Sequence, residues 1–131
     1  MPLIKRGRKD VELVSIENPH GGKGTGTCRQ LLGGDSTIPE LPANPGDFES
    51  CMKFLHESTL MPKAYIGLHP HEDTEEIYFI VEGEGEMKID GKVIRVTSGD
   101  ACLIKRGSAH DFRNIGDIPL RWVVVTASVK Q

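Results

Sequence analysis

Residues 67–83 have the sequence Gly67-Leu68-His69-Pro70-His71-Glu72-Asp73-Thr74-Glu75-Glu76-Ile77-Tyr78-Phe79-Ile80-Val81-Glu82-Gly83. Alternate side chains of a β-strand point to the same face, so His69 and His71 are expected to reach one face together, with Pro70 turned away. The acidic segment 72–75 is typical of a turn, and Glu76 opens a run of strand-forming residues. If this second strand doubles back, Glu76 meets the two histidines.

The side chains of His69, His71 and Glu76 are of the types that bind metal ions. Two neutral imidazoles and one carboxylate are a common ligand set for a divalent transition metal ion. A third histidine, His110, lies farther along, in the segment Lys105-Arg106-Gly107-Ser108-Ala109-His110-Asp111-Phe112-Arg113-Asn114. A single histidine on a strand is more often a packed or surface residue than a ligand, so the argument depends on the spacing of the whole set.

The two segments resemble the paired motifs of the cupin superfamily. The first motif, G-x5-H-x-H-x4-E-x6-G, matches at His69, His71, Glu76 and Gly83. The second motif, G-x5-P-x-G-x2-H-x3-N, matches at Gly99, Gly107, His110 and Asn114. Lys63 and Lys105 stand where the family has glycine and proline, and both departures concern turn residues. The resemblance covers residues 63–114.

The resemblance looks closest to small single-domain cupins similar to oxalate decarboxylases. It implies an all-β fold, a double-stranded β-helix or jelly-roll barrel, in which His69, His71, Glu76 and His110 hold one divalent metal ion. Manganese, iron, nickel and zinc all suit such ligands, and the ligand set does not choose among them. The resemblance also implies a homodimer, in which two chains pair their sheets and cover strand edges.

Composition supports a single β-rich domain. The chain has 131 residues, which suits one domain, and its 15 glycines and eight prolines favour many turns. No stretch of a dozen residues combines a helical apolar period with helix caps. We therefore expect one domain over 1–131, in which the barrel implied by the resemblance spans about 27–127 and an N-terminal arm with a glycine-rich loop spans 1–26.

Charge and apolar content exclude several classes of partner. The net charge of −3 and the isoelectric point near 5.9 argue against a nucleic-acid surface. No apolar run approaches the roughly 20 residues that span a bilayer, and no signal peptide is apparent. Cys28, Cys51 and Cys102 lie in or near strand-like segments without CxxC spacing, which fits reduced thiols in the cytoplasm.

The remaining sequence predicts short strands separated by turns. The predicted strands lie around residues 11–15, 27–32, 48–56, 64–67, 87–89, 93–96, 101–104, 110–114 and 120–127. Residues 18–26 form a glycine-rich flap or turn without phosphate-loop order, and residues 35–47 form an irregular connection. His20 is interpreted as a surface histidine and His56 as one at the edge of the core. Strict alternation places Tyr65 and Gly67 on the face of His69, where Gly67 would leave room above the metal.

Four protein ligands leave open positions on a six-coordinate ion, and open positions allow a substrate to bind. A bidentate small acid, such as a dicarboxylate or a 2-oxo acid, could occupy two of them. Arg29 and Arg113 are candidates to neutralise its charge, although each is more often a surface ion-pair partner. Tyr78 either lines the pocket or fills the core.

Two functions remain open. The first is a metal-dependent enzyme acting on a small carboxylate or sugar-like substrate, with oxalate decarboxylase-like or dioxygenase-like chemistry. A decarboxylase needs a proton donor near the metal, and no glutamate outside the ligand set can be assigned to that role. The second is a non-catalytic, metal-dependent module that binds or senses a small molecule.

Overall fold

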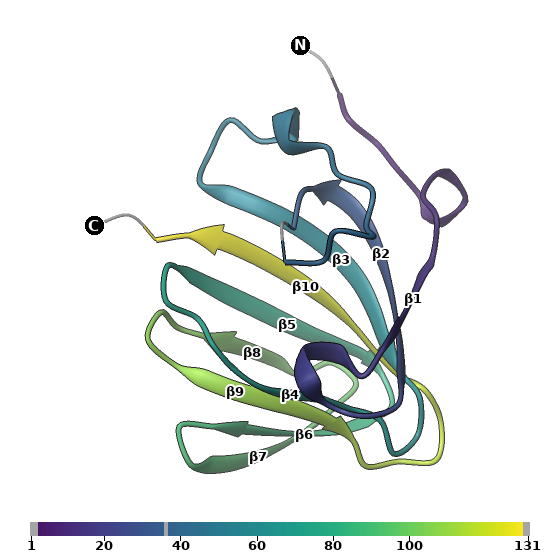
Figure 1. Cartoon of the computed structure of the whole chain (residues 1–131), viewed down its shortest axis with the longest axis vertical. Coiled ribbons are helices and arrows are strands. Elements are labelled where there is room, and N and C mark those ends of the chain that lie inside the picture. The colour runs from purple at the N-terminus through teal and green to yellow at the C-terminus, as the bar shows by residue number, and fades with distance from the viewer. Residues whose placement is uncertain (1–2, 36, 130–131) are drawn as a thin grey trace.

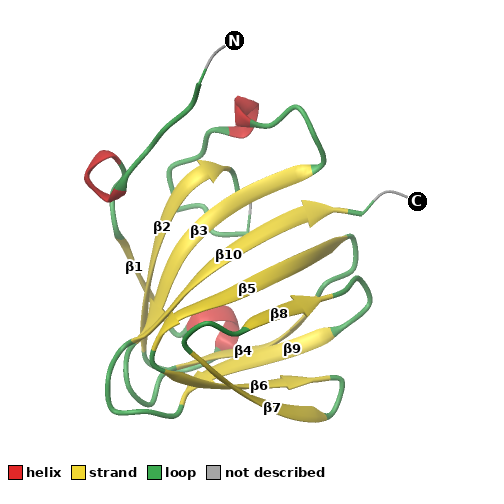
Figure 2. Cartoon of the chain, turned by 180° about the vertical axis from the view of Figure 1, so that it is seen from behind, coloured by secondary structure: helices red, strands yellow, loops and turns green. Residues whose placement is uncertain are grey.

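The computed structural model describes residues 3–35 and 37–129, which form ten strands and three single turns of 3-10 helix. The strands are β1 (Val14–Glu17), β2 (Thr25–Gly33), β3 (Met52–Leu60), β4 (Tyr65–Pro70), β5 (Thr74–Glu82), β6 (Glu84–Ile89), β7 (Lys92–Thr97), β8 (Ala101–Ile104), β9 (Ala109–Asn114) and β10 (Leu120–Ser128). The helical turns are η1 (Arg8–Asp10), η2 (Pro19–Gly21) and η3 (Pro45–Asp47). Figure 2 shows how little of the chain is helical. The predicted all-β fold is confirmed.

The strands form two antiparallel sheets that enclose the core (Figure 1). The larger sheet has the order β1-β2-β3-β10-β5-β8, and the smaller sheet has the order β4-β9-β6-β7. Segments far apart in sequence are therefore neighbours, since β10 lies between β3 and β5. This is the jelly-roll arrangement that the motifs imply. Because β1 pairs with β2, part of the predicted N-terminal arm adds a strand to the larger sheet.

The inner face of the larger sheet is arranged in rows across its strands, because alternate residues of each strand point inward. The row that contains Glu76 continues through Thr126 to Phe54. The next row runs from Tyr78 through Val124 and His56 to Gln30, and the third from Ile80 through Trp122 and Ser58 to Cys28. All these residues are buried. The first two rows carry polar groups on Glu76, Thr126, Tyr78, His56 and Gln30, and these rows face the functional site.

Apolar residues close the barrel behind those rows. Ile80, Met87, Ile104, Phe112 and Leu120 are fully buried between the two sheets. Each side chain of this size contributes about 1.5–3 kcal/mol by leaving water. Apolar packing therefore holds the two sheets together. The polar side chains lie at the other end of the barrel, where Glu76 and His110 are.

The β6–β7 hairpin forms as the sequence predicts. Asp90 and Gly91 connect the two strands with φ angles of 47° and 84°. Two consecutive residues with positive φ are typical of a type I′ turn, whose twist matches that of the strands it joins, and Asp-Gly is a favoured pair there.

Two predicted strands are displaced in the structure. The strand expected around residues 11–15 is β1, over Val14–Glu17, and the strand expected over 48–56 is β3, over Met52–Leu60. Apolar residues lie on both faces of the segment 48–56, so alternation alone does not fix where the strand begins. Pairing decides it, because β10 runs alongside β3 from Met52 to Leu60. Cys51 consequently lies outside the strand and is exposed, unlike the buried Cys28.

Strict alternation also fails in β4. The register shifts between the pairs Ile66–Phe112 and His69–His110, where β4 has one residue more than β9. This bulge lets both Ile66 and His69 face inward, whereas Tyr65 faces outward and packs under the Arg113 guanidinium, 4.8 Å from the ring centroid. The prediction that Tyr65 shares the face of His69 is wrong for this reason.

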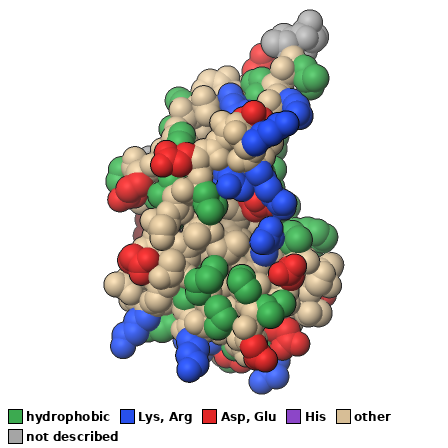
Figure 3. Space-filling model, turned by 90° about the vertical axis from the view of Figure 1, so that its right-hand side faces the viewer, with side chains coloured by type: hydrophobic (Ala, Val, Ile, Leu, Met, Phe, Trp, Pro, Cys, Tyr) green, Lys and Arg blue, Asp and Glu red, His purple; other side chains and the backbone are tan. Residues whose placement is uncertain are grey.

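The outer surface carries charges of both signs. On the face shown in Figure 3, Lys and Arg side chains are interspersed with Asp and Glu, and hydrophobic side chains gather in its lower part. No helix in the described residues, 3–35 and 37–129, has the length and apolar character needed to cross a membrane.

Candidate metal centre

The structure brings the four motif side chains to one end of the barrel interior. His69 is in β4, His71 follows that strand directly, Glu76 is in β5 and His110 is in β9. His69 and His110 are partners across the β4–β9 pair, and Glu76 reaches them from the opposite sheet. One donor atom from each of the four residues lies within 4.8 Å of all the others. The two sheets are therefore both needed to assemble the cluster.

The spacing of these atoms suits a metal ion. His71 Nε2 lies 2.9 Å from His110 Nε2 and 3.1 Å from Glu76 Oε1, and His110 Nε2 lies 3.8 Å from the same oxygen. Around an ion with bonds of about 2.1 Å, donors at right angles lie about 3 Å apart and opposite donors about 4.2 Å apart. The three separations among His71, His110 and Glu76 are close to this range, so these donors suit a transition metal ion.

Neighbouring groups orient three of the four side chains. His69 Nδ1–H donates to the Gly67 carbonyl at 2.8 Å, which leaves Nε2 as the donor atom for a metal. His71 Nδ1 lies 3.2 Å from Thr74 Oγ1, and the Thr126 hydroxyl donates to Glu76 Oε2 at 2.8 Å. Such contacts from outside the ligand set fix ring orientation and tautomer in metal sites. His110 Nδ1 is buried without a partner among the described residues.

Burial sets the protonation states that a metal requires. It lowers the pKa of His110 to about 3 and also lowers the pKa of His69. Burial alone would raise the pKa of Glu76, but the hydrogen bond and charge of His71 outweigh it and lower that pKa. At neutral pH, His69 and His110 are therefore neutral and Glu76 is ionised, which are the forms that bind metals.

The glycine-rich loop covers one side of this centre. The His20 ring stacks on the His69 ring, with centroids 4.1 Å apart and planes 12° apart. A Cβ atom at Gly67 would collide with the His20 carbonyl oxygen, and one at Gly22 would collide with the Tyr65 carbonyl oxygen. Gly67 thus makes room for the loop rather than for the metal, which corrects our expectation. No sequence signal separates His20 from an ordinary surface histidine, because the contact depends on the path of the loop.

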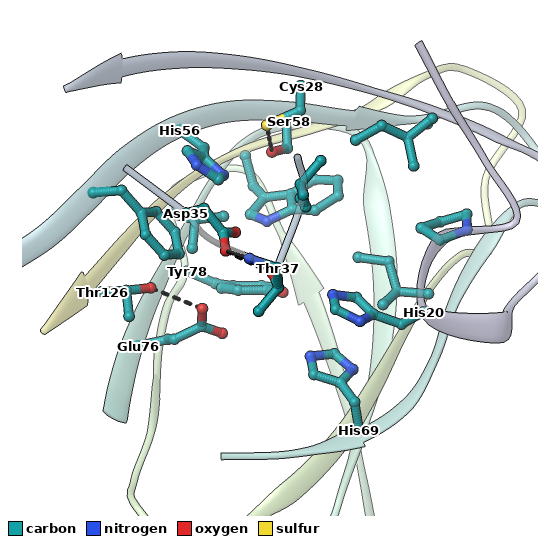
Figure 4. A pocket seen from close by; sticks show the side chains of 18 of the residues that line it. His20, Cys28, Asp35, Thr37, His56, Ser58, His69, Glu76, Tyr78 and Thr126 are labelled. Carbon is teal, nitrogen blue, oxygen red and sulfur yellow. Dashed lines mark hydrogen bonds between the residues drawn. The ribbon is translucent and has the colours of Figure 1, made fainter. Parts of the chain in front are cut away.

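A cavity of about 770 Å³ opens into the barrel from His69, His71 and Glu76, which are three of the four side chains. Figure 4 shows His56, Asp35, Thr37 and Tyr78 around it, together with His69 and Glu76. Asp35 Oδ1 accepts hydrogen bonds from the Thr37 backbone N–H at 2.8 Å and from its hydroxyl at 2.6 Å. Asp35 is thus a pocket carboxylate outside the candidate ligands. Sequence reasoning missed it because it lies in an irregular connection.

The two arginine candidates lie outside the cavity. Arg29 is on the outer face of β2, where it bonds to the Val11 carbonyl and lies 3.4 Å from Glu57 Oε1. Arg113 packs on Tyr65 on the outer face of β9. Both side chains point outward because their neighbours in sequence belong to the inward-facing set. Neither is placed to neutralise an acid bound at the metal centre.

Tyr78 both fills the core and lines the cavity, which are the two alternatives that the sequence left open. It is buried, its ring packs against Phe112 and Trp122, and its edge lies beside His110 with ring centroids 5.5 Å apart. Burial raises its pKa well above the ordinary value. The neutral phenol ring therefore fills the core and also forms part of the cavity wall beside the candidate ligands.

Comparison with known proteins agrees with the motifs. The cupin domain family matches residues 56–126, which include all four residues of the cluster. This chain belongs to the cupin family. The cupin is 34% identical over 110 residues to an oxalate-binding protein of Thermotoga maritima, covering 84% of this chain and 82% of that protein.

Solved structures show the same fold over nearly the whole chain. A predicted oxalate decarboxylase from Thermotoga maritima aligns with this cupin at a TM-score of 0.79 and 26% identity, covering 98% of this chain and all of that one. The polyketide cyclase RemF from Streptomyces resistomycificus aligns at a TM-score of 0.70 and 24% identity, covering 98% of this chain and 81% of that one. The second likeness concerns the fold alone.

Proposed function

We propose that this cupin binds a divalent transition metal ion through His69, His71, Glu76 and His110, and uses it to bind a small carboxylate. The observation that carries this proposal is the convergence of three imidazole nitrogens and one carboxylate oxygen at the end of a cavity. Four protein donors leave two positions on a six-coordinate ion, and a dicarboxylate or 2-oxo acid can fill both. Manganese, iron, nickel and zinc suit the ligands, and we place manganese and iron first.

The names of the relatives support an acid as the ligand. One similar protein is an oxalate-binding protein, and one similar structure is a predicted oxalate decarboxylase. We extend that ligand class to this chain. A metal ion supplies Lewis-acid polarisation of a bound carboxylate or carbonyl, which compensates for the absence of Arg29 and Arg113 from the cavity.

Two forms of this function remain candidates, and a different observation favours each. Asp35 favours an enzyme, with decarboxylase-like or dioxygenase-like chemistry, because it supplies a cavity carboxyl group outside the candidate metal ligands. The oxalate-binding relative favours a non-catalytic module that binds or senses its ligand. Both forms require the same metal centre.

One set of measurements tests the proposal and separates its two forms. Protein purified without a metal-chelating tag is analysed for its elements, reloaded with manganese or iron, and titrated with oxalate by calorimetry. We expect one ion per chain and oxalate binding that disappears after chelation. Release of carbon dioxide or consumption of oxygen identifies an enzyme, and binding without turnover across metals identifies the sensor. Oxalate binding that is equal with and without metal contradicts the proposal.

We also propose that two copies of this cupin pair through the outer face of the larger sheet. Ile77, Phe79 and Val81 of β5 and Leu103 of β8 are 39–50% exposed there. Ile77 is paired with Leu103 and with Val125 of β10, so the apolar side chains form a continuous patch. Contiguous exposed apolar surface of this kind marks interaction sites.

A cytoplasmic location, which the free thiols suit, stays a prediction.

A further inference from the structure

The cavity continues beyond the metal centre to a histidine that metal binding does not use. His56 of β3 is 4% exposed and lines the cavity wall. It lies one row beyond Glu76 on the inner face of the larger sheet, and two strands away, because β10 separates β3 from β5. Figure 4 shows its ring apart from both Glu76 and His69.

Hydrogen bonds determine which nitrogen of His56 carries the proton. Gln30 Nε2 donates to the Pro42 carbonyl, and Gln30 Oε1 accepts from the Asp35 backbone N–H at 2.8 Å. These two contacts fix the orientation of the Gln30 amide, since a carbonyl only accepts and a backbone N–H only donates. The 2.7 Å contact between Gln30 Oε1 and His56 Nε2 is therefore donated by Nε2–H. A neutral imidazole protonated on Nε2 has its lone pair on Nδ1.

The other nitrogen of His56 is free to meet a ligand. Nδ1 makes no hydrogen bond to any described residue, and the ring lines the cavity. Burial lowers the pKa of His56 to about 4, so the ring is neutral near pH 7. Stacking on Phe54, with centroids 4.1 Å apart, holds the ring in place. Because Nδ1 is an acceptor without a partner among the described residues, a ligand in the cavity that brings a hydrogen-bond donor can bind to it.

The sheet wall between His56 and the metal centre is mainly apolar and aromatic, and Thr126, which bonds to Glu76, is its polar member. Val124 and Tyr78 share the row of His56, and Trp122 and Phe54 lie in the adjacent rows. Two strand spacings and two residues of strand separate the Cα atoms of His56 and Glu76, which is about 12 Å on an ideal sheet. Oxalate, with two carbon atoms, is too short to reach from the metal to His56. A ligand with a ring between its two polar ends is long enough.

We propose that the ligand of this cupin is an aromatic acid, bound to the metal by its acid end, with a hydroxyl group at its far end that donates to His56 Nδ1. The cavity of about 770 Å³ is in the range of pockets that enclose ligands much larger than oxalate. Its aromatic wall suits a flat ring. This inference rests on the proposed function, because the metal centre holds the acid end of the ligand.

The test compares two probes that differ only in the hydroxyl group. Manganese-loaded protein is titrated by calorimetry with 4-hydroxyphenylpyruvate, with phenylpyruvate and with oxalate. Both aryl probes carry a 2-oxo acid for the metal and a ring for the aromatic wall. We expect the hydroxylated probe to bind roughly five- to tenfold more tightly than phenylpyruvate, which is the effect of one net hydrogen bond.

Two variants connect that preference to His56. In His56→Gln the new amide can still reach Gln30, but the acceptor at the Nδ1 position is lost, so the affinity ratio of the two aryl probes should fall to about one. His56→Asn returns an oxygen near the Nδ1 position and should restore part of the ratio. Arg113→Gln, on the outer face of the other sheet, serves as the control and should keep the wild-type ratio. Thermal unfolding establishes that each variant is folded.

The outcomes separate this inference from the proposed function. If the protein binds oxalate but neither aryl probe, the inference is wrong and the metal centre stands. Equal affinities of the two aryl probes for the wild-type protein also overturn it, and this result does not depend on any variant folding. If none of the three acids binds in the presence of metal, the proposed function fails together with the inference.

Discussion

At the scale of single residues, His71 makes the shortest contacts within the proposed centre. Its Nε2 lies 2.9 Å from His110 Nε2 in the smaller sheet and 3.1 Å from Glu76 Oε1 in the larger sheet. Removal of His71 therefore takes away the donor atom that contacts ligands from both sheets. The side chain is not part of the apolar core that holds the barrel together. His71 is therefore the position where metal binding can be separated from folding.

His71→Ala should strip the metal and leave a folded β protein. Loss of one of four ligands weakens a metal site by far more than the roughly ten- to hundredfold that loss of a supporting contact costs. The measurement is the metal content of the purified variant, with circular dichroism for the fold. Leu68→Ala is the control, since Leu68 lies beside His69 in β4 but is 65% exposed. Unchanged metal stoichiometry in His71→Ala would refute the ligand assignment.

Gly67→Ala tests the contact between β4 and the glycine-rich loop. The new Cβ would meet the His20 carbonyl oxygen, so the loop and its stacking on His69 must shift. We expect a loss of about 1–3 kcal/mol in the free energy of unfolding, measured by urea denaturation of the metal-free protein. At Gly46 a Cβ meets nothing within 4 Å, so Gly46→Ala should change stability by less than about 1 kcal/mol. Equal effects at the two positions would contradict this explanation.

At the scale of elements, the end of β9 shows a motif residue with a structural role. Asn114 is buried, its Nδ2 donates to the Leu60 and Ile118 carbonyls at 3.0 and 2.8 Å, and its Oδ1 accepts from the Gly116 N–H at 2.8 Å. One side chain thus ties the end of β3 to the turn between β9 and β10. This asparagine of the second motif stabilises the closed end of the barrel and is not one of the candidate metal ligands.

Asn114→Leu should destabilise the protein without removing the metal ligands. Three backbone groups would lose their partner, and each buried group left without a hydrogen bond costs about 1–3 kcal/mol. Partial access of water to the turn reduces the sum, so we expect a loss of about 2–4 kcal/mol in the free energy of unfolding. Urea denaturation measures it. A loss below 1 kcal/mol would show that the turn closes without this residue.

At the scale of the whole molecule, the buried histidines make the metal-free protein sensitive to acid. Burial lowers the pKa of His56 to about 4 and that of His110 to about 3, below the ordinary value near 6.5. Between these values the unfolded chain binds more protons than the folded one, so stability falls as the pH falls below about 6.5. The lowered pKa of Glu76 acts in the same direction at lower pH.

Metal-free protein should therefore lose stability between pH 7 and pH 5. Each of the two histidines contributes up to about 1.4 kcal/mol per pH unit below its unfolded pKa, so the expected loss is about 2–4 kcal/mol. Urea unfolding at a series of pH values measures it. Removing one buried histidine, as in His56→Gln, should flatten the curve. A stability that is constant from pH 7 to pH 5 would contradict the lowered pKa values.

The whole molecule should also be a dimer through the outer face of the larger sheet. Light scattering at micromolar concentration should give twice the 14.4 kDa of one chain. Phe79→Glu places a charge in the apolar patch and should produce the monomer. Val93→Glu, at an exposed position of β7 in the smaller sheet, should leave the dimer intact. A monomeric mass for the wild-type chain would contradict the proposed pairing.

The amino-acid sequence alone shows at which intervals the candidate metal ligands and the turn-forming residues follow one another. The histidines and Glu76 stand at fixed intervals within strand-like runs, and Asp90-Gly91 marks a hairpin, because alternation and turn conformation are local properties. These features predicted an all-β chain and a common role for the four motif residues. The family resemblance supplied what local patterns lack, which is how distant strands meet.

Which side chains face the cavity depends on how the strands pair and how the loops run. The bulge in β4 turned Tyr65 outward, the position of Arg29 on β2 removed it from the site, and the paths of two loops brought His20 and Asp35 to it. Each of these outcomes depends on strand register and on contacts between segments far apart in sequence. A single extra residue in one strand changes the face of every side chain that precedes it, and only pairing with β9 shows that this residue is there.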